Sequence, residues 1–106
     1  MMMRDALLSA LPVFRALGEP VRVRIIETLL DKNGPATVGE LQATLAIPQS
    51  TVSRHLRILL DAHLLAVTRD GAQRHYRLDV PEEALNAIEH LVREVRACQS
   101  EKGHRN

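Results

Sequence analysis

An amphipathic helix is predicted at residues 48–62, PQSTVSRHLRILLDA. Its predicted inward face consists of residues at helical spacing, the last of which directly follows the quoted stretch: Val52, Leu56, Leu59, Leu60 and His63. Its opposite face carries hydroxyl, amide and guanidinium groups, with a carboxylate only in the last turn: Gln49, Ser50, Ser53, Arg54, Arg57 and Asp61. Short donors fit a groove, and arginine suits bidentate contacts with guanine or phosphate. This face is therefore predicted to lie against a polyanion.

The composition is that of one globular domain. The chain has 106 residues, of which 45% are hydrophobic and 25% charged, enough for a single core. No apolar run approaches the ~20 residues of a membrane span, and MMMRDALLSALP is too weakly apolar and too soon interrupted to be expected as a secretion signal. The single cysteine, Cys98, excludes an internal disulfide framework, so a cytoplasmic location and no membrane partner are expected.

Charge is segregated along the chain, although the formal net charge is only +1. Residues 48–78 hold five arginines and two aspartates, a balance of +3. Residues 79–102 hold three basic and six acidic side chains, a balance of −3. A positive middle beside a negative C-terminal segment indicates a local anionic partner.

Two helices are predicted before residue 35. The first, at 5–17, is apolar enough to need a cover, which a second subunit can provide, and Pro12 should kink it or mark its beginning. The second begins at Pro20 and ends at 32–35, KNGP. Its predicted core face consists of Val21, Ile25, Ile26, Leu29 and Leu30.

A helix-turn-helix is predicted from the next two helices. Thr37-x-x-Glu40 is a capping box that opens a short helix ending near Leu45. A tight connection at 46–48 leads to the helix at 48–62. Two short helices joined in this way, the second polar on one face, are typical of this motif.

A basic β-hairpin is predicted at residues 64–78. Side chains alternate with a period of two on either side of Asp70-Gly71, which is a turn signal. The tip and the returning strand carry polar and basic residues: Arg69, Gln73, Arg74, His75 and Arg77. A basic hairpin that directly follows a helix-turn-helix is a wing.

The last predicted helix spans residues 80–99 and opens with a second capping signature, Asp79-x-x-Glu82. Its apolar stripe is near heptad spacing, and little chain is left to cover it, which indicates dimerisation with the first helix. The predicted dimer interface comprises Leu7, Leu8, Leu11, Phe14, Leu85, Ile88, Leu91, Val92, Val95 and Cys98. We therefore expect one winged helix-turn-helix domain at residues 1–100 and a flexible tail at 101–106.

Three segments resemble the ArsR/SmtB family of winged-helix transcriptional repressors. They are FRALGEPVRVRIIETLL (14–30), VGELQATLAIPQSTVSRHLRILLDAHLL (38–65) and DGAQRHYRL (70–78). The resemblance implies a mainly α fold with a small hairpin, in a homodimer joined by its first and last helices. It also implies that helix 48–62 enters the major groove of a palindromic double-stranded operator, and that an unidentified inducer weakens binding. One departure is Pro48, where many members have serine.

The DNA contacts follow from residue chemistry. Base contacts are assigned to the helix: Gln49, Ser50, Thr51, Ser53, Arg54, His55 and Arg57. Phosphate contacts are assigned to Arg69, Arg74 and Arg77 of the wing and to the hydroxyls near the start of the helix, and Gln73 of the wing is also predicted to bind DNA. For Arg22 and Arg24 in the second helix, surface ion pairs are expected.

The metal-sensor positions of relatives are not ligands in this chain. They correspond to Thr37 and Gly39 at one site and to Pro81, Val92 and Val95 at another, so no metal or cofactor is expected. His90 and Glu94 with His104 would make an incomplete alternative set. Cys98 is expected to be a packing residue of the seam, with a redox-responsive regulator as the alternative.

Two other classes of function compete with DNA binding. A winged helix devoted to protein–protein contact would need an apolar or acidic helix face and wing, and the arginines oppose it. An enzyme is not expected, because the sequence has no phosphate loop, nucleophile elbow or paired catalytic carboxylates.

Overall fold

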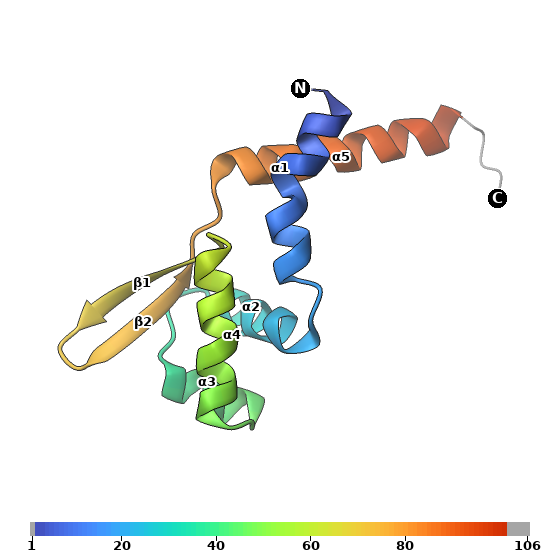
Figure 1. The fold of residues 1–106 in the computed structure, drawn as a ribbon. Coiled ribbons are helices and arrows are strands. Elements are labelled where there is room, and N and C mark those ends of the chain that lie inside the picture. The colour runs from blue at the N-terminus through green and yellow to red at the C-terminus, as the bar shows by residue number, and fades with distance from the viewer. Residues whose placement is uncertain (1, 102–106) are drawn as a thin grey trace.

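A computed structural model describes residues 2–101. The elements follow the order α1 (Met3–Ala16), α2 (Pro20–Lys32), α3 (Val38–Leu45), α4 (Gln49–Asp61), β1 (Leu65–Asp70), β2 (Gln73–Leu78) and α5 (Glu82–Glu101). The hairpin, α2, α3 and α4 lie at one end, and α5 lies at the other, crossed by α1 (Figure 1). This confirms the predicted mainly α fold in winged-helix order. Residues 102–106 of the predicted tail lie outside the described residues.

The main core lies among α2, α3, α4 and the base of the hairpin. Its largest fully buried side chains are Ile25, Leu29, Leu41, Val52, Leu56, Leu59 and Leu64. Burying one such side chain contributes roughly 1.5–3 kcal/mol. The prediction for Leu30 was wrong, since that side chain is 62% exposed. Ile25 and Leu29 set the core face four residues apart, and Leu30 is turned about 100° away from Leu29.

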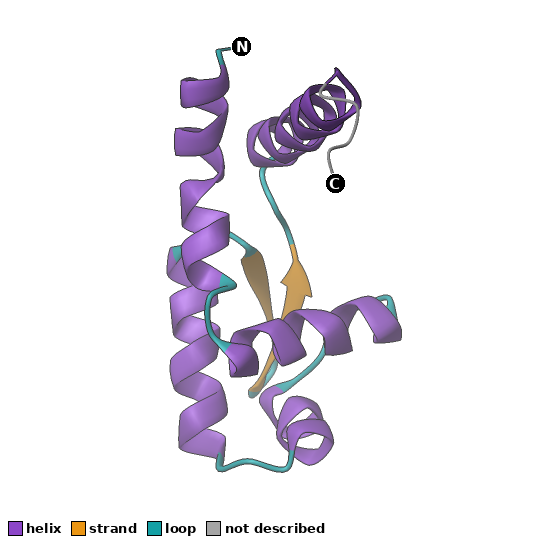
Figure 2. Ribbon diagram, turned by 90° about the vertical axis from the view of Figure 1, so that its right-hand side faces the viewer, coloured by secondary structure: helices purple, strands orange, loops and turns teal. Residues whose placement is uncertain are grey.

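The helix α1 connects the two ends of the molecule. It runs through Pro12 from Met3, so the helix does not begin at the proline. Its buried face is made of small side chains, Ala6, Ala10, Val13 and Ala16, and not of its leucines. Ala6 and Ala10 pack with Ala87 of α5, and these small side chains let the two backbones approach. The two helices lie next to each other in Figure 2.

The helix α5 begins later than its capping signature predicted. The first amide hydrogen bonds, from Ala84 and Leu85, go to the carbonyl of Pro81. If Asp79 were the N-cap of a capping box, Val80 would be the first residue of the helix. The predicted start at residue 80 was therefore wrong. A residue before proline is disfavoured in helical conformation, which explains the later start at Glu82.

The hairpin is anchored at its base and free at its tip. The strands pair antiparallel from Leu65↔Leu78 to Asp70↔Gln73, so the turn is Gly71-Ala72, one residue beyond the predicted Asp70-Gly71. Gly71 has φ +65°, which a type II′ turn needs at its first position. The buried Tyr76 exchanges two backbone hydrogen bonds with Ala36, of 2.9 and 2.8 Å, which tie β2 to the α2–α3 connection.

None of the helices in the described part of the chain combines the length and apolar character that a membrane crossing needs.

Candidate DNA-binding surface

One face of α4 holds the core and the other is open. Val52, His55, Leu56 and Leu59 are buried. The predicted base-contacting residues on the other side are exposed, with Thr51 half-buried: Gln49, Ser50, Ser53, Arg54 and Arg57. Arg57 has an ion pair with Asp61, with Nε 3.5 Å from Oδ1, but both side chains are largely exposed. Such a pair contributes about 0–1 kcal/mol, so Arg57 remains available to a ligand.

The N-terminus of α4 has no capping side chain. Pro48 is the N-cap and makes no side-chain hydrogen bond, while its carbonyl accepts from the amides of Thr51 and Val52. The side chain of a proline has no acceptor, so Pro48 cannot cap α4 as a serine would. The start of α4, Gln49, lies within one residue of the predicted start.

The wing concentrates positive charge without neutralising it locally. Arg69 and Arg74 are direct cross-strand partners. Like charges placed opposite one another destabilise a hairpin, and an anion between them relieves the repulsion. Arg77 donates from Nη1 to Oγ1 of Thr68 over 2.8 Å, which orients its guanidinium along the sheet.

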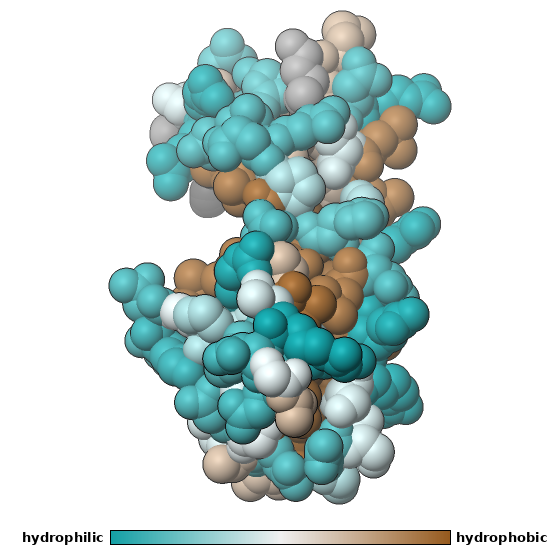
Figure 3. All heavy atoms as spheres, turned by 90° about the vertical axis from the view of Figure 1, so that its left-hand side faces the viewer, coloured by the Kyte–Doolittle hydropathy of each residue, from teal (hydrophilic) through white to brown (hydrophobic). Residues whose placement is uncertain are grey.

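A groove of about 560 Å³ brings α4 and the wing together. Its polar lining comes from both elements: Gln49, Ser53, Arg57, Arg69, Gln73 and Arg74. The start of α3, Thr37 to Gly39, forms another wall. Hydrophilic side chains cover much of the face that carries the hairpin, whereas apolar ones gather between the two ends of the molecule (Figure 3). The fold thus brings residues that were predicted to bind DNA, and that are far apart in the sequence, to one groove.

His55 is the predicted DNA contact that the structure does not bring to this surface. Its side chain is 7% exposed, on the core side of α4. The ring Nδ1 lies 3.2 Å from Nη1 of Arg22 and 4.0 Å from Oε1 of Glu19. Burial lowers the pKa of His55, and the nearby Glu19 carboxylate opposes that shift. The sequence suggested that His55 contacts DNA because it is a polar residue next to Arg54 in the helix predicted to bind DNA.

Arg22 and Arg24 also differ from the expected surface ion pairs. Nε of Arg22 donates to the carbonyl of Ala16, at the end of α1. Nη2 of Arg24 donates to the carbonyl of Leu45, over 3.4 Å. Both guanidiniums therefore bond backbone carbonyls of neighbouring helices.

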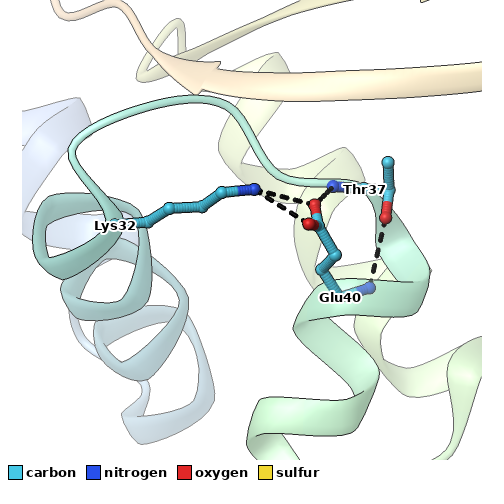
Figure 4. Close-up of polar contacts among 3 residues, drawn as sticks. All are labelled: Lys32, Thr37 and Glu40. Carbon is cyan, nitrogen blue, oxygen red and sulfur yellow. Dashed lines mark hydrogen bonds and ion pairs between the residues drawn. The ribbon is translucent and has the colours of Figure 1, made fainter.

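The α2–α3 junction is held by a polar network (Figure 4). Oγ1 of Thr37 accepts from the amide of Glu40 over 3.2 Å, and Oε1 of Glu40 accepts from the amide of Thr37 over 2.8 Å. Nζ of Lys32 donates to both carboxylate oxygens, at 2.9 and 3.0 Å. The Thr37 amide, and then Lys32, lower the pKa of Glu40. The predicted capping box is confirmed, and it fixes the direction of α3 ahead of α4.

The predicted dimer residues form an exposed apolar surface on α1 and α5. The exposed members are Leu7, Leu8, Phe14, Leu85, Val92 and Val95. Leu11, Ile88 and Leu91 are half-buried. Cys98 is exposed in this chain, beyond the part of α5 that packs on α1.

Among residues 2–101, no group of three or more histidine, cysteine, aspartate or glutamate side chains lies close enough to hold a metal ion. Thr37 caps α3 with its side chain. His104, the third member of the alternative set, lies outside the described residues.

A helix-turn-helix with an exposed arginine face, followed by a basic hairpin, defines a winged-helix DNA-binding protein. A family model described as a helix-turn-helix domain matches residues 17–68. The chain is 36% identical over 100 residues to the transcriptional regulator CmtR of Mycobacterium tuberculosis, covering 94% of this chain and 80% of CmtR. It is 39% identical over 75 residues to the repressor SmtB of the same organism, covering 71% of this chain and 54% of SmtB.

Solved structures agree with these relatives. HlyU of Vibrio cholerae is 29% identical, with a TM-score of 0.66 over 81% of this chain and 90% of HlyU. The repressor BigR of Xylella fastidiosa is 28% identical, with a TM-score of 0.68 over 82% of this chain and 87% of BigR. The chain belongs to the ArsR/SmtB family of winged-helix transcriptional regulators. It is a DNA-binding transcriptional regulator, as the sequence predicted.

Proposed function

We propose that this protein is a homodimeric repressor that places α4 of each subunit in the major groove of a palindromic operator. The observation that carries the proposal is the continuity of the exposed α4 face with the arginines of the wing across one groove. A helix fits the major groove, where each base pair presents a distinct pattern of donors and acceptors. In this proposal the protein binds operator DNA in the cytoplasm and catalyses no reaction.

The two elements have different tasks in this proposal. The α4 residues that read bases are Gln49, Ser50, Thr51, Ser53, Arg54 and Arg57. The wing residues that hold the backbone are Arg69, Gln73, Arg74 and Arg77. His55 is left out of the contact set because it is buried. Base contacts give sequence preference, and phosphate contacts give affinity that falls with salt.

The homodimer is supported by the apolar surface of α1 and α5. Leu8 is 57% exposed, and the other exposed apolar residues of this surface are 41–45% exposed. Covering them with the same surface of a second copy gives a two-fold axis. The two α4 helices would then read half-sites one helical turn apart, about 34–36 Å.

The test is fluorescence anisotropy on the upstream DNA of the protein's own gene, with a scrambled duplex alongside and several salt concentrations. We expect tighter binding to the native duplex and a linear fall of log affinity with log salt, whose slope counts the phosphates engaged. Equal binding to both duplexes would contradict sequence-specific regulation. Failure to bind either at low salt would favour a protein partner for the α4 face.

The same assay addresses the inducer. Zn²⁺ and an oxidant are each added to the complex, and release of DNA identifies a response. Cys98→Ser is the matched variant, because an exposed thiol is what a redox response needs. Release by oxidant that persists in Cys98→Ser would exclude Cys98 as its cause.

A further inference from the structure

A partly buried polar contact connects α4 with the corner between α1 and α2. It consists of the ring of His55, the guanidinium of Arg22, the carbonyl of Ala16 and the carboxylate of Glu19. The DNA contacts described above use none of these groups. Placing a histidine and an arginine in a mostly apolar interface is costly unless they are bonded, so their arrangement needs a reason.

The chemistry of arginine fixes the state of the histidine. A guanidinium only donates, so a hydrogen bond between Nη1 of Arg22 and Nδ1 of His55, which lie 3.2 Å apart, requires Nδ1 to be the acceptor. That bond requires the neutral ring with its proton on Nε2, whereas a proton on Nδ1 would face Oε1 of Glu19 at 4.0 Å. Oε1 of Glu19 is occupied by the amide of Val21 at 2.7 Å, where it caps α2.

Arg22 joins two helices with different tasks. Its Nε bonds the carbonyl of Ala16, in the last turn of α1, where carbonyls lack partners within the helix. Its Nη1 bonds His55, whose neighbour Arg54 points to the exposed face. One guanidinium thus ties the end of α1, which carries part of the apolar surface, to the middle of α4.

We propose that Arg22 and His55 are positioning residues for DNA binding, which hold α4 against the end of α1 and release it when His55 is protonated. This inference rests on the proposed operator binding. It adds a pH response to that function, through residues that do not touch DNA.

The direction of the pH response follows from the groups that face His55. A protonated ring donates from both nitrogens, so Nδ1 loses its bond with Arg22, and the ring charge is repelled by Arg22 and Arg54. Glu19 alone favours the charged ring, and it already caps α2. Burial lowers the pKa of His55 below its usual 6.5, so the folded protein binds fewer protons than the unfolded chain. The contact is complete above about pH 6.5 and is lost as the pH falls through the lowered value.

Two pairs of variants separate this contact from general effects. Arg22→Met removes the donors and keeps an apolar stem, and Arg24→Met makes the same change two residues along α2. His55→Asn keeps an acceptor near the position of Nδ1 but cannot be protonated. His63→Asn is its control, because His63 is exposed and has φ +61°, which asparagine tolerates.

Operator binding is measured from pH 8 to 5.5 at several salt concentrations. Arg22→Met should weaken binding about 10-fold or more at pH 7.5, as loss of a charge-assisted bond allows. Arg24→Met should stay within about two-fold, because Arg24 is exposed and its one bond, to the carbonyl of Leu45, is long at 3.4 Å. The salt slope should not change, whereas a lost phosphate contact would reduce it by about 1. Wild type and His63→Asn should lose affinity in acid, and His55→Asn should keep it.

Three results would overturn the proposal. They are unchanged operator binding by Arg22→Met, equal losses in Arg22→Met and Arg24→Met, and identical acid profiles for wild type and His55→Asn. If Arg22→Met does not fold, Arg22→Lys replaces it, since an ammonium retains the charge but loses the planar fork that reaches both acceptors.

NMR of the histidine ring nitrogens in the free protein keeps the test independent of DNA. We expect Nδ1 of His55 to be unprotonated at pH 7.5, with a resonance that shifts in Arg22→Met and not in Arg24→Met. A protonated Nδ1 or an unshifted resonance would refute the contact itself. If wild type fails to prefer the operator, the proposed function fails, while these spectra still decide whether Arg22 and His55 are bonded.

Discussion

The two ends of the molecule expose different kinds of side chain. At one end, α4 and the wing expose arginines, hydroxyls and amides around a groove. At the other, α1 and α5 expose leucines, valines and a phenylalanine. Each of these helices also has a buried face, which holds the fold. Exposed faces that differ so much in chemistry serve different partners, an anionic one at the wing and an apolar one at α1 and α5.

The largest expected effect comes from placing a charge on the apolar end. Leu8→Glu should prevent dimerisation, because the carboxylate would be buried without a partner in the proposed interface. The chain should still fold, since Leu8 is 57% exposed. Without a dimer, only one half-site is bound at a time, and operator affinity should fall by about 100-fold or more. Analytical ultracentrifugation and anisotropy measure the two effects.

A charge of the same kind on α2 is the matched control for that variant. Leu30 is 62% exposed and is not part of the apolar surface of α1 and α5. Leu30→Glu should leave both dimer and operator binding intact. If both variants dissociate the dimer equally, or if neither does, the apolar end does not serve a second copy.

The next effect tests whether the polar end reads sequence. Arg54→Ala should weaken binding to the operator by about 1–3 kcal/mol, the value of one bidentate base contact, and should change binding to scrambled DNA much less. Paired anisotropy titrations on the two duplexes measure the difference. An equal loss on both would make Arg54 a phosphate contact and leave α4 without its principal reader.

The elements of the polar end could be predicted from sequence because their signals are local. A capping box, a glycine at a turn and a strong helical period each specify backbone structure within a few residues. Thr37, Glu40 and Gly71 therefore mark α3 and the wing turn to within one residue. The exposed face of α4 followed from the spacing of its apolar residues. The contacts of that face with DNA remain a prediction.

The packing partners could not be predicted, because they depend on residues far apart in the chain. The sequence assigned the leucines of α1 to a dimer interface, but it did not identify Ala6 and Ala10 as the buried residues that pack against α5. His55 was predicted to contact DNA, but its side chain contacts Arg22, which lies 33 positions earlier in the chain. A local pattern shows that a helix has two faces, and the tertiary fold determines which side chains each face buries.

A smaller effect is expected from the wing. Arg74→Ala should weaken binding to both duplexes by a similar few-fold factor and reduce the salt slope by about 1. The free protein should become slightly more stable, because Arg74 no longer faces Arg69 across the hairpin. Anisotropy at several salt concentrations and thermal unfolding give the two results. A loss confined to the operator would show that the wing reads bases.

The smallest effect on DNA binding is expected at the α2–α3 junction, where polar contacts hold the fold. Thr37→Ala should lower the free energy of unfolding by about 1 kcal/mol, the usual contribution of a capping side chain, and leave dimerisation unchanged. Thermal unfolding monitored by circular dichroism measures this. A change in the dimer would show that the two ends are not independent.

Glu40→Gln sharpens the same test through pH. Thr37 and Lys32 lower the pKa of Glu40 below 4.5, so the folded protein releases this proton more readily than the unfolded chain. The stabilisation is present above pH 4.5 and is lost as the pH falls through the lowered value. Wild type should therefore lose stability on acidification more steeply than Glu40→Gln, whose amide still accepts from Thr37 but cannot attract Lys32 as a charge. Parallel losses between pH 6 and 3 would mean that this ionised carboxylate does not hold α3, and that the threonine cap alone positions the polar end.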